Sequence, residues 1–531
     1  MNEEIKKEDG SMGIYLNPGN TKFQESRNGE IYVDKSLLIE YTNKVMKTPN
    51  KNLCVSRPRR FGKSTDANML VAYYSKDCDS SSLFDDLKIS QVNNYKTHLN
   101  QYNVIHLNMQ DFLSKTHDID KMIVLLTRLV FREIKRVYPD VDYFDTSDLV
   151  QIFEDLFAET NESFIFVIDE WDCLFREYKD DKEAQKKYLD FLRNLLKDKP
   201  YVSLAYMTGI LPIKKYGTHS ALNMFKEISM IDSTPLSPFM GFTDTEVKEL
   251  CEKYDMDFKD MQSWYDGYHL DDDISVYSPR SVVYALQDRK YGNYWTSSET
   301  YEALKIYIDM DFDGLKEDII KLLNNEKIGV DTSSFQNDMT TFQSKEDVFT
   351  LLVHLGYLGY DSINKEVYIP NKEVTDSFIQ SIKNSSWNET TKALLNSKEL
   401  LEATWAMKEE SVAHYIEQAH LHTSIIQYND ENALSYTLSL AYYTARDYYT
   451  MIREMPSGKG YADIVFIPKK DKPAMVIELK WDKDVDTAIK QIKDKNYIHG
   501  LENYLDNLLL VGISYNKETK KHECMIEKYK S

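Results

Sequence analysis

A Gly-Lys-Ser loop follows a short apolar segment early in the chain, and this pairing is the strongest constraint on the fold. Residues 52–65 read NLCVSRPRRFGKST, and a plausible helix follows. In a strand–loop–helix unit of this kind, glycine lets backbone amides point at phosphate, lysine reaches the β/γ oxygens and the hydroxyl ligates Mg²⁺. The helix N-terminus adds a positive dipole end. We therefore expect Gly62, Lys63, Ser64 and Thr65 to contact a nucleotide, with Ser64 on the metal.

The loop departs from the general G-x-x-x-x-G-K pattern at its first position. Arg57 stands where the first glycine is usual, and Pro58, Arg59, Arg60 and Phe61 follow it. The loop is therefore basic and partly stiffened by proline. We include Arg57, Arg59, Arg60 and Phe61 among the expected nucleotide-binding residues.

A second apolar segment ends in two acidic residues. Residues 164–172 read FIFVIDEWD, and the run 164–168 is typical of a parallel strand buried on both faces. At the end of such a strand, Asp169 can hold the Mg²⁺ shell through water, and Glu170 can polarise the attacking water. Ordinary helix caps at Ser64 and Asp169 are the alternative, but the two motifs in this order favour nucleotide hydrolysis.

A third strand, expected over residues 201–208, ends in a polar residue. Thr208 precedes a glycine, and its hydroxyl is placed to face the γ-phosphate as a sensor. A Thr-Gly pair is also an ordinary exit from a strand into a loop, so both interpretations stand.

A second constellation lies near the other end of the chain. Residues 458–480, GKGYADIVFIPKKDKPAMVIELK, contain two apolar runs joined by a charged turn, which predicts a β-hairpin. Because strand side chains alternate faces, Glu478 and Lys480 point the same way, and pairing can bring Asp463 beside them. Two carboxylates form an oxygen site for Mg²⁺, and the lysine can orient or activate a bound water. Asp463, Glu478 and Lys480 are therefore candidate residues for phosphodiester hydrolysis.

A helical stretch follows this hairpin. Residues 487–497, TAIKQIKDKNY, place Gln491 and Lys495 one turn apart, where they suit a substrate phosphate or the attacking water. The alternative for Glu478 and Lys480 is a solvated strand edge, because E-x-K is common by chance. The combined spacing of Asp463, Glu478-x-Lys480 and Gln491 is more specific than the triplet.

Taken together, these motifs resemble a known family, the bacterial and archaeal AAA-ATPase-like proteins that carry a C-terminal nuclease domain of the PD-(D/E)XK superfamily. The resemblance covers most of the chain, and the basic loop without its first glycine is typical of it. The residues that carry it are Tyr32-Val33-Asp34-Lys35-Ser36, Arg57 to Ser64, VIDEWD, Thr208-Gly209-Ile210, Tyr265-Asp266-Gly267-Tyr268, Tyr277-Ser278-Pro279 and the hairpin with QIKDKNY.

The resemblance implies an ATP-binding α/β module in front of a restriction-type nuclease fold. It places Lys63 and Ser64 at the phosphate and Mg²⁺ positions, with the acidic pair Asp169 and Glu170 at the metal and water positions. The nuclease core falls on Asp463, Glu478 and Lys480. Glu431 resembles the acidic residue of the first nuclease helix and is a further candidate metal ligand, with a solvated helix face as the alternative.

Composition is compatible with this interpretation. The 531 residues suggest about three domains, and 42% hydrophobic content is ordinary for a globular protein. No apolar stretch approaches the roughly 18 residues that cross a bilayer, and the start lacks a signal-peptide core, so we expect a cytoplasmic protein without a membrane partner. Five scattered cysteines form no C-x-x-C pair, which predicts neither a zinc site nor a disulfide framework.

The net charge of −21 argues against a protein that coats nucleic acid generally. Residues 451–531 nevertheless hold 15 Lys and Arg against 13 Asp and Glu, a local +2, which leaves −23 on the remainder. A near-neutral nuclease segment can bind nucleic acid, DNA rather than RNA in our expectation, through a local lysine face. Ring assembly is common among AAA-like ATPases, so a homo-oligomer is also compatible.

These anchors predict an α/β protein in three parts. Residues 1–238 form a P-loop domain with a parallel sheet and flanking helices. Residues 239–398 form a mainly helical lid or connector, winged-helix-like in part near 345–368, and residues 399–531 form a restriction-endonuclease-like α/β domain. The predicted function is an ATPase whose nucleotide state gates a Mg²⁺-dependent nuclease. The alternative is a nucleotide-switched regulatory or interaction protein whose C-terminal fold binds without cutting.

Overall fold

The structure is a computed structural model that describes most of the chain. The described residues are 13–216, 219–270, 274–295, 301–310, 312, 314–383, 396–422, 437–457, 460–469, 472–494, 501–519 and 521–529. The chain forms two compact units, Met1–Trp295 with Gly329–Val374, and Thr296–Ile328 with Thr375–Ser531.

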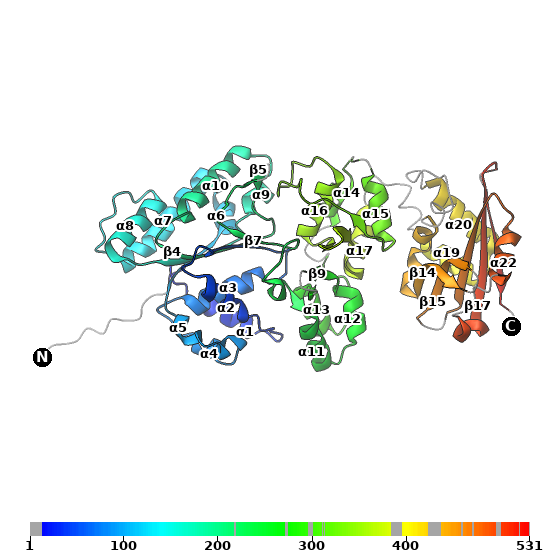
Figure 1. The fold of residues 1–531 in the computed structure, drawn as a ribbon, viewed down its shortest axis with the longest axis horizontal. Helices are drawn as coiled ribbons and strands as arrows, with labels where there is room; N and C mark the ends of the chain where they lie inside the picture. The colour runs from blue at the N-terminus through cyan, green and yellow to red at the C-terminus, as the bar shows by residue number, and fades with distance from the viewer. Residues whose placement is uncertain are drawn as a thin grey trace. The chain divides into compact units, whose positions relative to one another are not determined.

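The first unit is built on a five-stranded parallel sheet (Figure 1). Its spatial order is β2 (Asn103–Asn108), β3 (Phe164–Asp169), β4 (Val202–Gly209), β1 (Asn52–Ser56) and β7 (Lys226–Ile228). Strands β1, β3 and β4 are buried along their whole length, as expected for apolar strands covered on both faces. The three strands predicted from the sequence at these positions are confirmed, and their carboxyl ends meet at one edge.

Helices cover both faces of this sheet. Figure 1 shows α7, α8 and α10 on one side of it and α2 and α3 on the other. Asp118, Asp148 and Asp181 begin α7, α8 and α10 by accepting a hydrogen bond from a first-turn amide. The helices are α1 (Thr21–Arg27), α2 (Leu37–Val45), α3 (Lys63–Tyr74), α4 (Ser81–Phe84), α5 (Tyr95–His98), α6 (Met109–Thr116), α7 (Ile119–Val137), α8 (Leu149–Thr160), α9 (Cys173–Glu177) and α10 (Lys182–Leu196), with 3-10 turns η1 (Lys88–Gln91) and η2 (Ser237–Phe239) and the small strands β5 (Lys215–Tyr216) and β6 (His219–Ser220).

A smaller layer completes the first unit. Strands β8 (Phe242–Thr243), β10 (Ile274–Tyr277) and β9 (Tyr268–Leu270) form an antiparallel sheet beside α11 (Asp244–Tyr254), α12 (Phe258–Tyr265) and α13 (Pro279–Asp288). The predicted helix followed by a hairpin is confirmed as α16 (Lys345–Leu355), β12 (Gly359–Asp361) and β13 (Glu366–Tyr368). Gly267 has φ +107°, and a Cβ there would lie 2.0 Å from the Pro370 carbonyl oxygen, so only glycine fits.

The second unit contains a mixed five-stranded sheet. Its order is β14 (Tyr449–Ser457), β15 (Gly460–Pro468), β16 (Ala474–Trp481), β17 (Leu508–Asn516) and β18 (Lys521–Lys528), antiparallel except for the β16–β17 pair. The predicted hairpin is therefore confirmed as β15 and β16. Figure 1 shows α20 (Glu409–His422) and α22 (Val485–Asp494) on opposite sides of this sheet. Residues Val476, Ile489 and Leu510 belong to the core that joins α22 to the strands.

The remaining elements of the described residues are α14 (Tyr301–Ile308), α15 (Leu315–Leu323), β11 (Ile328–Gly329), α17 (Lys372–Lys383), α19 (Ser397–Trp405), η4 (Tyr443–Asp447) and η5 (Glu502–Asn507). The middle of the chain is mainly helical, as predicted. Across the described residues, the structure contains no helix with the length and apolar composition that crossing a bilayer requires. The boundaries at 238 and 398 stay a prediction.

Candidate nucleotide and nuclease sites

The Gly-Lys-Ser loop lies at the carboxyl edge of the parallel sheet. Gly62 precedes α3 with φ +82°, and Lys63 is the first residue of the helix. The Lys63 side chain is buried, and its Nζ donates to the Arg57 oxygen at 3.1 Å and the Pro58 oxygen at 2.9 Å. Burial lowers the pKa of Lys63 to about 8, although nearby carboxylates, Glu170 first, oppose this. Lys63 is thus held inside the loop, where a phosphate would compete with two carbonyls for its protons.

Ser64 and Asp169 meet across the sheet edge. The Ser64 Oγ donates to Asp169 Oδ2 at 2.7 Å, although β4 separates β1 from β3. Asp169 is buried, and this desolvation raises its pKa, while the Ser64 hydrogen bond and Lys63 oppose the rise. A hydroxyl and a carboxylate in direct contact are hard oxygen ligands of the kind that Mg²⁺ uses beside substrate phosphates, so this pair fits the metal.

Glu170 adopts a left-handed backbone conformation, with φ +52°. Its carboxylate accepts a hydrogen bond from Arg176, whose Nε also lies 3.2 Å from Asp172 Oδ2. Burial raises the pKa of Glu170, and Arg176 opposes this rise most strongly. Asp172 is buried and accepts the backbone amides of Ile210 and Leu211 at 3.0 and 2.8 Å. Arg176 therefore connects the carboxylate expected to polarise water to the loop that follows β4.

Arg57, at the position of the usual first glycine, is buried inside the protein. Its Nη2 lies 2.6 Å from Asp66 Oδ2, and its Nη1 donates to the carbonyls of Phe61 and Phe239. Phe61 is also buried and meets the Tyr268 ring edge-on, with centroids 5.3 Å apart. These two residues tie the loop to the smaller layer of the first unit.

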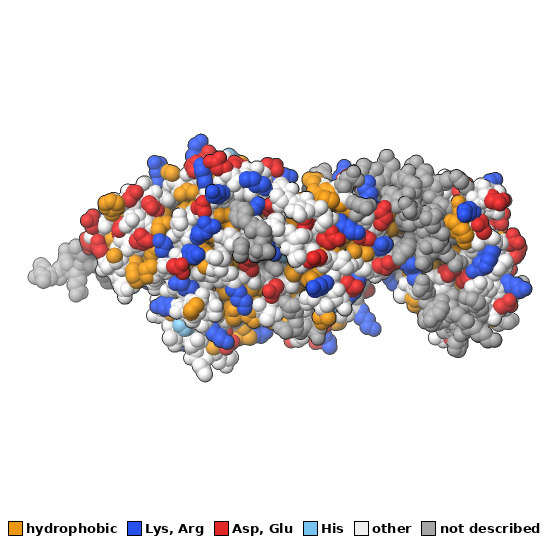
Figure 2. All heavy atoms as spheres, turned by 45° about the horizontal axis from the view of Figure 1, so that its top comes forward, with side chains coloured by type: hydrophobic (Ala, Val, Ile, Leu, Met, Phe, Trp, Pro, Cys, Tyr) orange, Lys and Arg blue, Asp and Glu red, His pale blue; other side chains and the backbone are white. Residues whose placement is uncertain are grey.

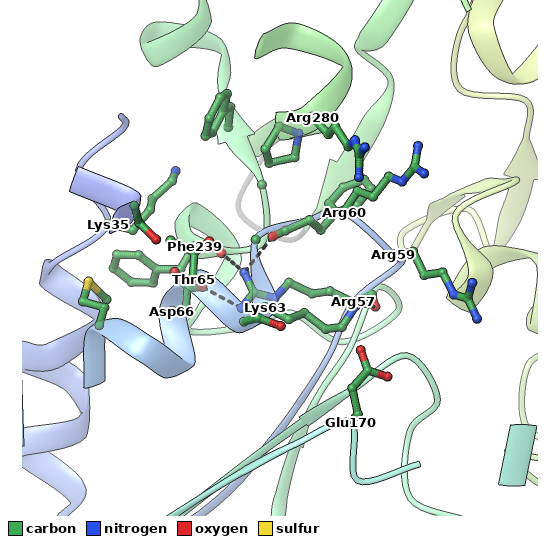
Figure 3. Close-up of a pocket in the computed structure, with 18 of the residues that line it drawn as sticks. Lys35, Arg57, Arg59, Arg60, Lys63, Thr65, Asp66, Glu170, Phe239 and Arg280 are labelled. Carbon is green, nitrogen blue, oxygen red and sulfur yellow. Dashed lines mark hydrogen bonds and ion pairs between the residues drawn. The ribbon is translucent and has the colours of Figure 1, made fainter. Parts of the chain in front are cut away.

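A cavity of about 880 Å³ opens in front of the loop. Ser64 and Thr65 are exposed toward it, and Arg59, Arg60, Glu170 and Arg280 are also among its lining residues. Figure 3 shows Arg280 and Glu170 approaching the loop from opposite sides. Arg60 donates to the Tyr294 oxygen at 3.1 Å, and Arg280 donates to the Tyr284 hydroxyl at 2.7 Å. The cavity therefore brings together most of the residues expected at the nucleotide.

Thr208 lies at the same sheet edge but points into the protein. It is fully buried, and its hydroxyl donates to the Val55 oxygen at 2.9 Å. It stands opposite Asp169 in the register of β3 and β4. The strand end is thus where the sequence predicted, while the sensor role of the hydroxyl stays a prediction.

The C-terminal candidates converge on β15, β16 and α22. Asp463 Oδ2 accepts the Leu479 amide at 2.6 Å, and Lys480 Nζ lies 2.7 Å from Glu478 Oε1. Gln491, on α22, donates to the same Glu478 oxygen. Glu478 and Lys480 are both buried, so the alternative of a solvated strand edge is excluded for this pair. The antiparallel register pairs Ile464 with Ile477. Asp463, which precedes Ile464, therefore lies at the same end of the hairpin as Glu478, which follows Ile477.

Two carboxylates with a lysine and an amide fit a Mg²⁺ site, because this ion keeps several waters and takes one or two protein carboxylates beside substrate phosphates. Asp463 and Glu478 would hold the ion, which would supply a more acidic bound water and neutralise phosphodiester charge. Within the described ranges, no group of three His, Cys, Asp or Glu residues is placed to hold a metal. The third predicted ligand of this site, Glu431, lies outside the described residues, and so does Lys495, which was predicted one turn after Gln491.

Comparison with known families finds a match in each half of the chain. Residues 18–218 match the AAA-ATPase-like family, described as "Predicted AAA-ATPase", and residues 431–524 match the PD-(D/E)XK nuclease superfamily. The chain contains an AAA-ATPase-like domain and, toward its C-terminus, a domain of the PD-(D/E)XK nuclease superfamily. No curated protein sequence matches it.

Solved structures similar to this chain include a Walker-type ATPase of Pyrococcus abyssi, with 13% identity, a TM-score of 0.34, and coverage of 66% of this chain and 97% of the other. The Aeropyrum pernix ORC2 protein, in ADPNP and ADP complexes, has 10% identity, a TM-score of 0.22, and coverage of 67% and 96%. The ORC1 protein of the same organism, in complex with DNA, has 10% identity, a TM-score of 0.25, and coverage of 70% and 97%.

Two residues of the AAA-ATPase-like domain were not singled out from the sequence. Lys35 lines the cavity and donates to the Pro238 oxygen at 2.8 Å and to Glu246 Oε2 at 2.6 Å. Its only signal was its place in the Tyr-Val-Asp-Lys-Ser motif. Arg176 had no signal of its own beyond lying four residues after Asp172, the spacing that makes helical neighbours.

Proposed function

We propose that this protein binds and hydrolyses ATP with Mg²⁺ and that its C-terminal domain is a Mg²⁺-dependent nuclease whose activity depends on the nucleotide state. The observation that carries the nuclease part is the contact of Glu478 with both Lys480 and Gln491, beside Asp463. A buried carboxylate paired with a buried lysine adds little net stability to a fold, because the desolvation of the two charges offsets their attraction. This supports catalysis more than a plain structural role.

The ATPase part is supported by the contacts around the Gly-Lys-Ser loop. Lys63 would bind the phosphates after leaving its two carbonyl partners, and Ser64 with Asp169 would hold Mg²⁺. Glu170 would accept a proton from the attacking water. In this proposal, bound Mg²⁺ would neutralise phosphate charge at both sites.

The substrate of the nuclease domain is proposed to be nucleic acid, and DNA before RNA. The near-neutral charge of residues 451–531 within a chain of net charge −21 supports a local binding face. The runner-up is a nucleotide-switched binding protein whose C-terminal domain does not cut. The joint presence of Asp463, Glu478, Lys480 and Gln491 favours the nuclease, since a binding-only domain needs no such set.

Cleavage assays test the nuclease directly. The full-length protein is incubated with single- and double-stranded DNA and RNA, with Mg²⁺ or Mn²⁺, and with or without ATP. We expect Lys480→Ala to abolish cutting, while Lys483→Ala, at an exposed lysine on the same segment, leaves it unchanged. No cutting by the wild-type protein on any of these substrates would favour the switched binding protein.

The coupling to ATP is tested by a second pair of variants in the same assay. Lys63→Ala removes the proposed phosphate contact, and Lys44→Ala, at an exposed lysine of α2, is the matched control. We expect only Lys63→Ala to abolish ATP hydrolysis and the effect of ATP on cleavage. Equal cleavage with and without ATP by the wild-type protein would contradict gating while leaving the nuclease assignment in place.

A further inference from the structure

A basic groove runs along α7, on a part of the first unit that the nucleotide site does not use. The groove has a volume of about 780 Å³. Four of its lining residues are cationic, Arg128, Arg132, Lys135 and Arg136, and the others are Val124, Thr127, Phe131, Thr146 and Ser147. The lining therefore combines four positive charges with an apolar wall and hydroxyl groups, and it includes no carboxylate.

The three arginines form one row on the helix. Arg128, Arg132 and Arg136 are exposed and stand four residues apart, which places them on the same face in steps of about 6 Å. Like charges at this spacing destabilise an isolated helix by about 0.2–0.5 kcal/mol per pair. Among the residues that the structure describes, none of the three has an ion-pair partner. The row therefore costs the helix a small amount of stability, which an anion lying along it would offset.

Glu133, which follows Arg132 in the sequence, accepts the backbone amides of Ile14, Tyr15 and Leu16. Asp145 and Asp148, which flank the lining residues Thr146 and Ser147, are engaged with their own turns. Asp145 Oδ1 accepts the Ser147 amide at 2.8 Å and its hydroxyl at 2.7 Å. Asp148 accepts the Val150 amide at 2.9 Å at the start of α8. Lys135 donates to the carbonyl oxygens of Pro139 and Val141, at 2.9 and 3.2 Å, so the three arginines are the cations that remain for a ligand.

This row stands out against the rest of the surface. The chain has a net charge of −21, and Figure 2 shows acidic and basic side chains interspersed over the visible face. A groove whose charged lining residues are all cations is complementary to a ligand with regularly repeated negative charge. Apolar atoms of Val124 and Phe131 offer contact area for sugar or base. An acidic peptide of a partner protein would carry similar charge, but no other feature of the chain points to such a partner.

We infer that the α7 groove binds the sugar–phosphate backbone of a nucleic-acid strand, so that the ATPase-like unit contacts the substrate of the nuclease domain. This inference rests on the proposed function for the identity of the polyanion. Arg128, Arg132 and Arg136 contact successive phosphates, and the contacts carry affinity without reading sequence.

The test measures binding of a fluorescently labelled 30-nucleotide DNA strand to the full-length Lys480→Ala protein in EDTA, by anisotropy over a range of salt concentrations. The variant R128Q/R132Q/R136Q keeps long helix-forming side chains and removes three charges. The control K248A/K259A/K290A removes three charges from exposed lysines of the same unit. Circular dichroism checks that each variant is folded, and R128K/R132K/R136K restores the charge.

We expect the arginine-to-glutamine variant to bind at least about tenfold more weakly at low salt. Its plot of log K against log salt concentration should be less steep by about 2, because each single-strand phosphate contact contributes roughly 0.7 to the slope. The lysine control and the arginine-to-lysine variant should keep the wild-type slope. An unchanged slope in R128Q/R132Q/R136Q, or no DNA binding by the parent protein, would overturn the inference.

Three further outcomes separate this inference from the proposed function and from protein docking. If the wild-type protein cuts DNA and the arginine-to-glutamine change alters neither cutting nor binding, the nuclease stands and the groove assignment is wrong. If poly-glutamate binds the groove and DNA does not compete with it, the groove is a protein-docking site and the inference is overturned. If the wild-type protein never cuts and R128Q/R132Q/R136Q loses DNA binding, the groove assignment is supported and the nuclease assignment is contradicted.

Discussion

The Arg57 guanidinium lies 2.6 Å from the Asp66 carboxylate, and both side chains are buried. Arg57 stands where a P-loop usually has its first glycine, and here its charge is used to hold the loop to α3 and, through the Phe239 carbonyl, to the smaller layer. A glycine at this position would leave Asp66 without its cation. The departure from the general pattern therefore has a structural explanation.

Asp66→Ala should destabilise the first unit by about 3–5 kcal/mol, because it leaves a buried guanidinium without its carboxylate. Hydrogen exchange of α3 amides in increasing urea measures this loss. The control is Asp86→Ala, which breaks the ion pair with Arg27 at a carboxylate that is 63% exposed, and it should cost less than about 1 kcal/mol. Equal effects of the two substitutions would contradict a special role for the buried pair.

Lys63 should take up a proton when ATP binds at alkaline pH. Burial lowers its pKa to about 8, so above that pH the free protein increasingly holds a neutral amine, while bound phosphate favours the ammonium. ATP affinity should therefore fall as pH rises above 8. Calorimetry at pH 8.5 in two buffers of different ionisation enthalpy measures the uptake, and Lys63→Arg, whose charge does not titrate, should show none. Zero uptake by the wild-type protein would refute the prediction.

Arg176 should set the pH at which Glu170 works. The arginine opposes the rise in the Glu170 pKa that burial causes, so Arg176→Ala should raise this pKa further. The acid limb of the ATPase rate should then move to higher pH, while Arg176→Lys should move it back toward the wild-type position. Steady-state rates between pH 5 and 9 measure the shift. A fall in rate by the same factor at every pH would indicate a purely structural effect.

The sequence predicted relationships that follow from strand geometry. Parallel strands end at a common edge, which brings Ser64 to Asp169, and alternation along β16 places Glu478 and Lys480 on one face. It did not predict the partners of the basic residues, because these depend on tertiary packing between distant segments. Arg57 meets the carbonyl of Phe239, far along the chain, and no local pattern reports that contact.

The helical middle region was similarly predicted in outline only. Helical periodicity and turn residues indicated the helix and hairpin around 345–368, which lie close together in sequence. The contact of Tyr268 with Phe61 of the loop was not foreseen, although both residues lie in motifs that carried the family resemblance. A motif identifies residues that matter without saying which of them touch.

Glu373 should make the stability of the first unit depend on pH between about 4 and 7. This carboxyl is fully buried, and its Oε1 accepts the Tyr294 and Trp295 amides at 2.7 and 2.8 Å, while its Oε2 accepts the Ser281 hydroxyl at 2.9 Å. Burial raises its pKa to about 7 despite these donors. The Tyr294 carbonyl oxygen accepts a hydrogen bond from Arg60 of the Gly-Lys-Ser loop, so the Glu373 site supports the wall of the cavity.

The sign of the dependence follows from proton binding. Between the unfolded pKa, near 4.3, and about 7, the folded state holds a proton that the unfolded state has lost, so stability falls as pH rises through this window. The full change is on the order of 3 kcal/mol.

Glu373→Gln keeps an oxygen for both amides and can donate to Ser281, and it cannot ionise. We expect its local stability to be constant with pH and to exceed that of the wild-type protein at pH 8. Hydrogen exchange of the segment 288–295, corrected for intrinsic rates, measures this, with Glu25→Gln at an exposed carboxyl as the control. If the wild-type segment becomes more protected as pH rises, the carboxylate and not the acid is the form that the fold stabilises, and the prediction is wrong.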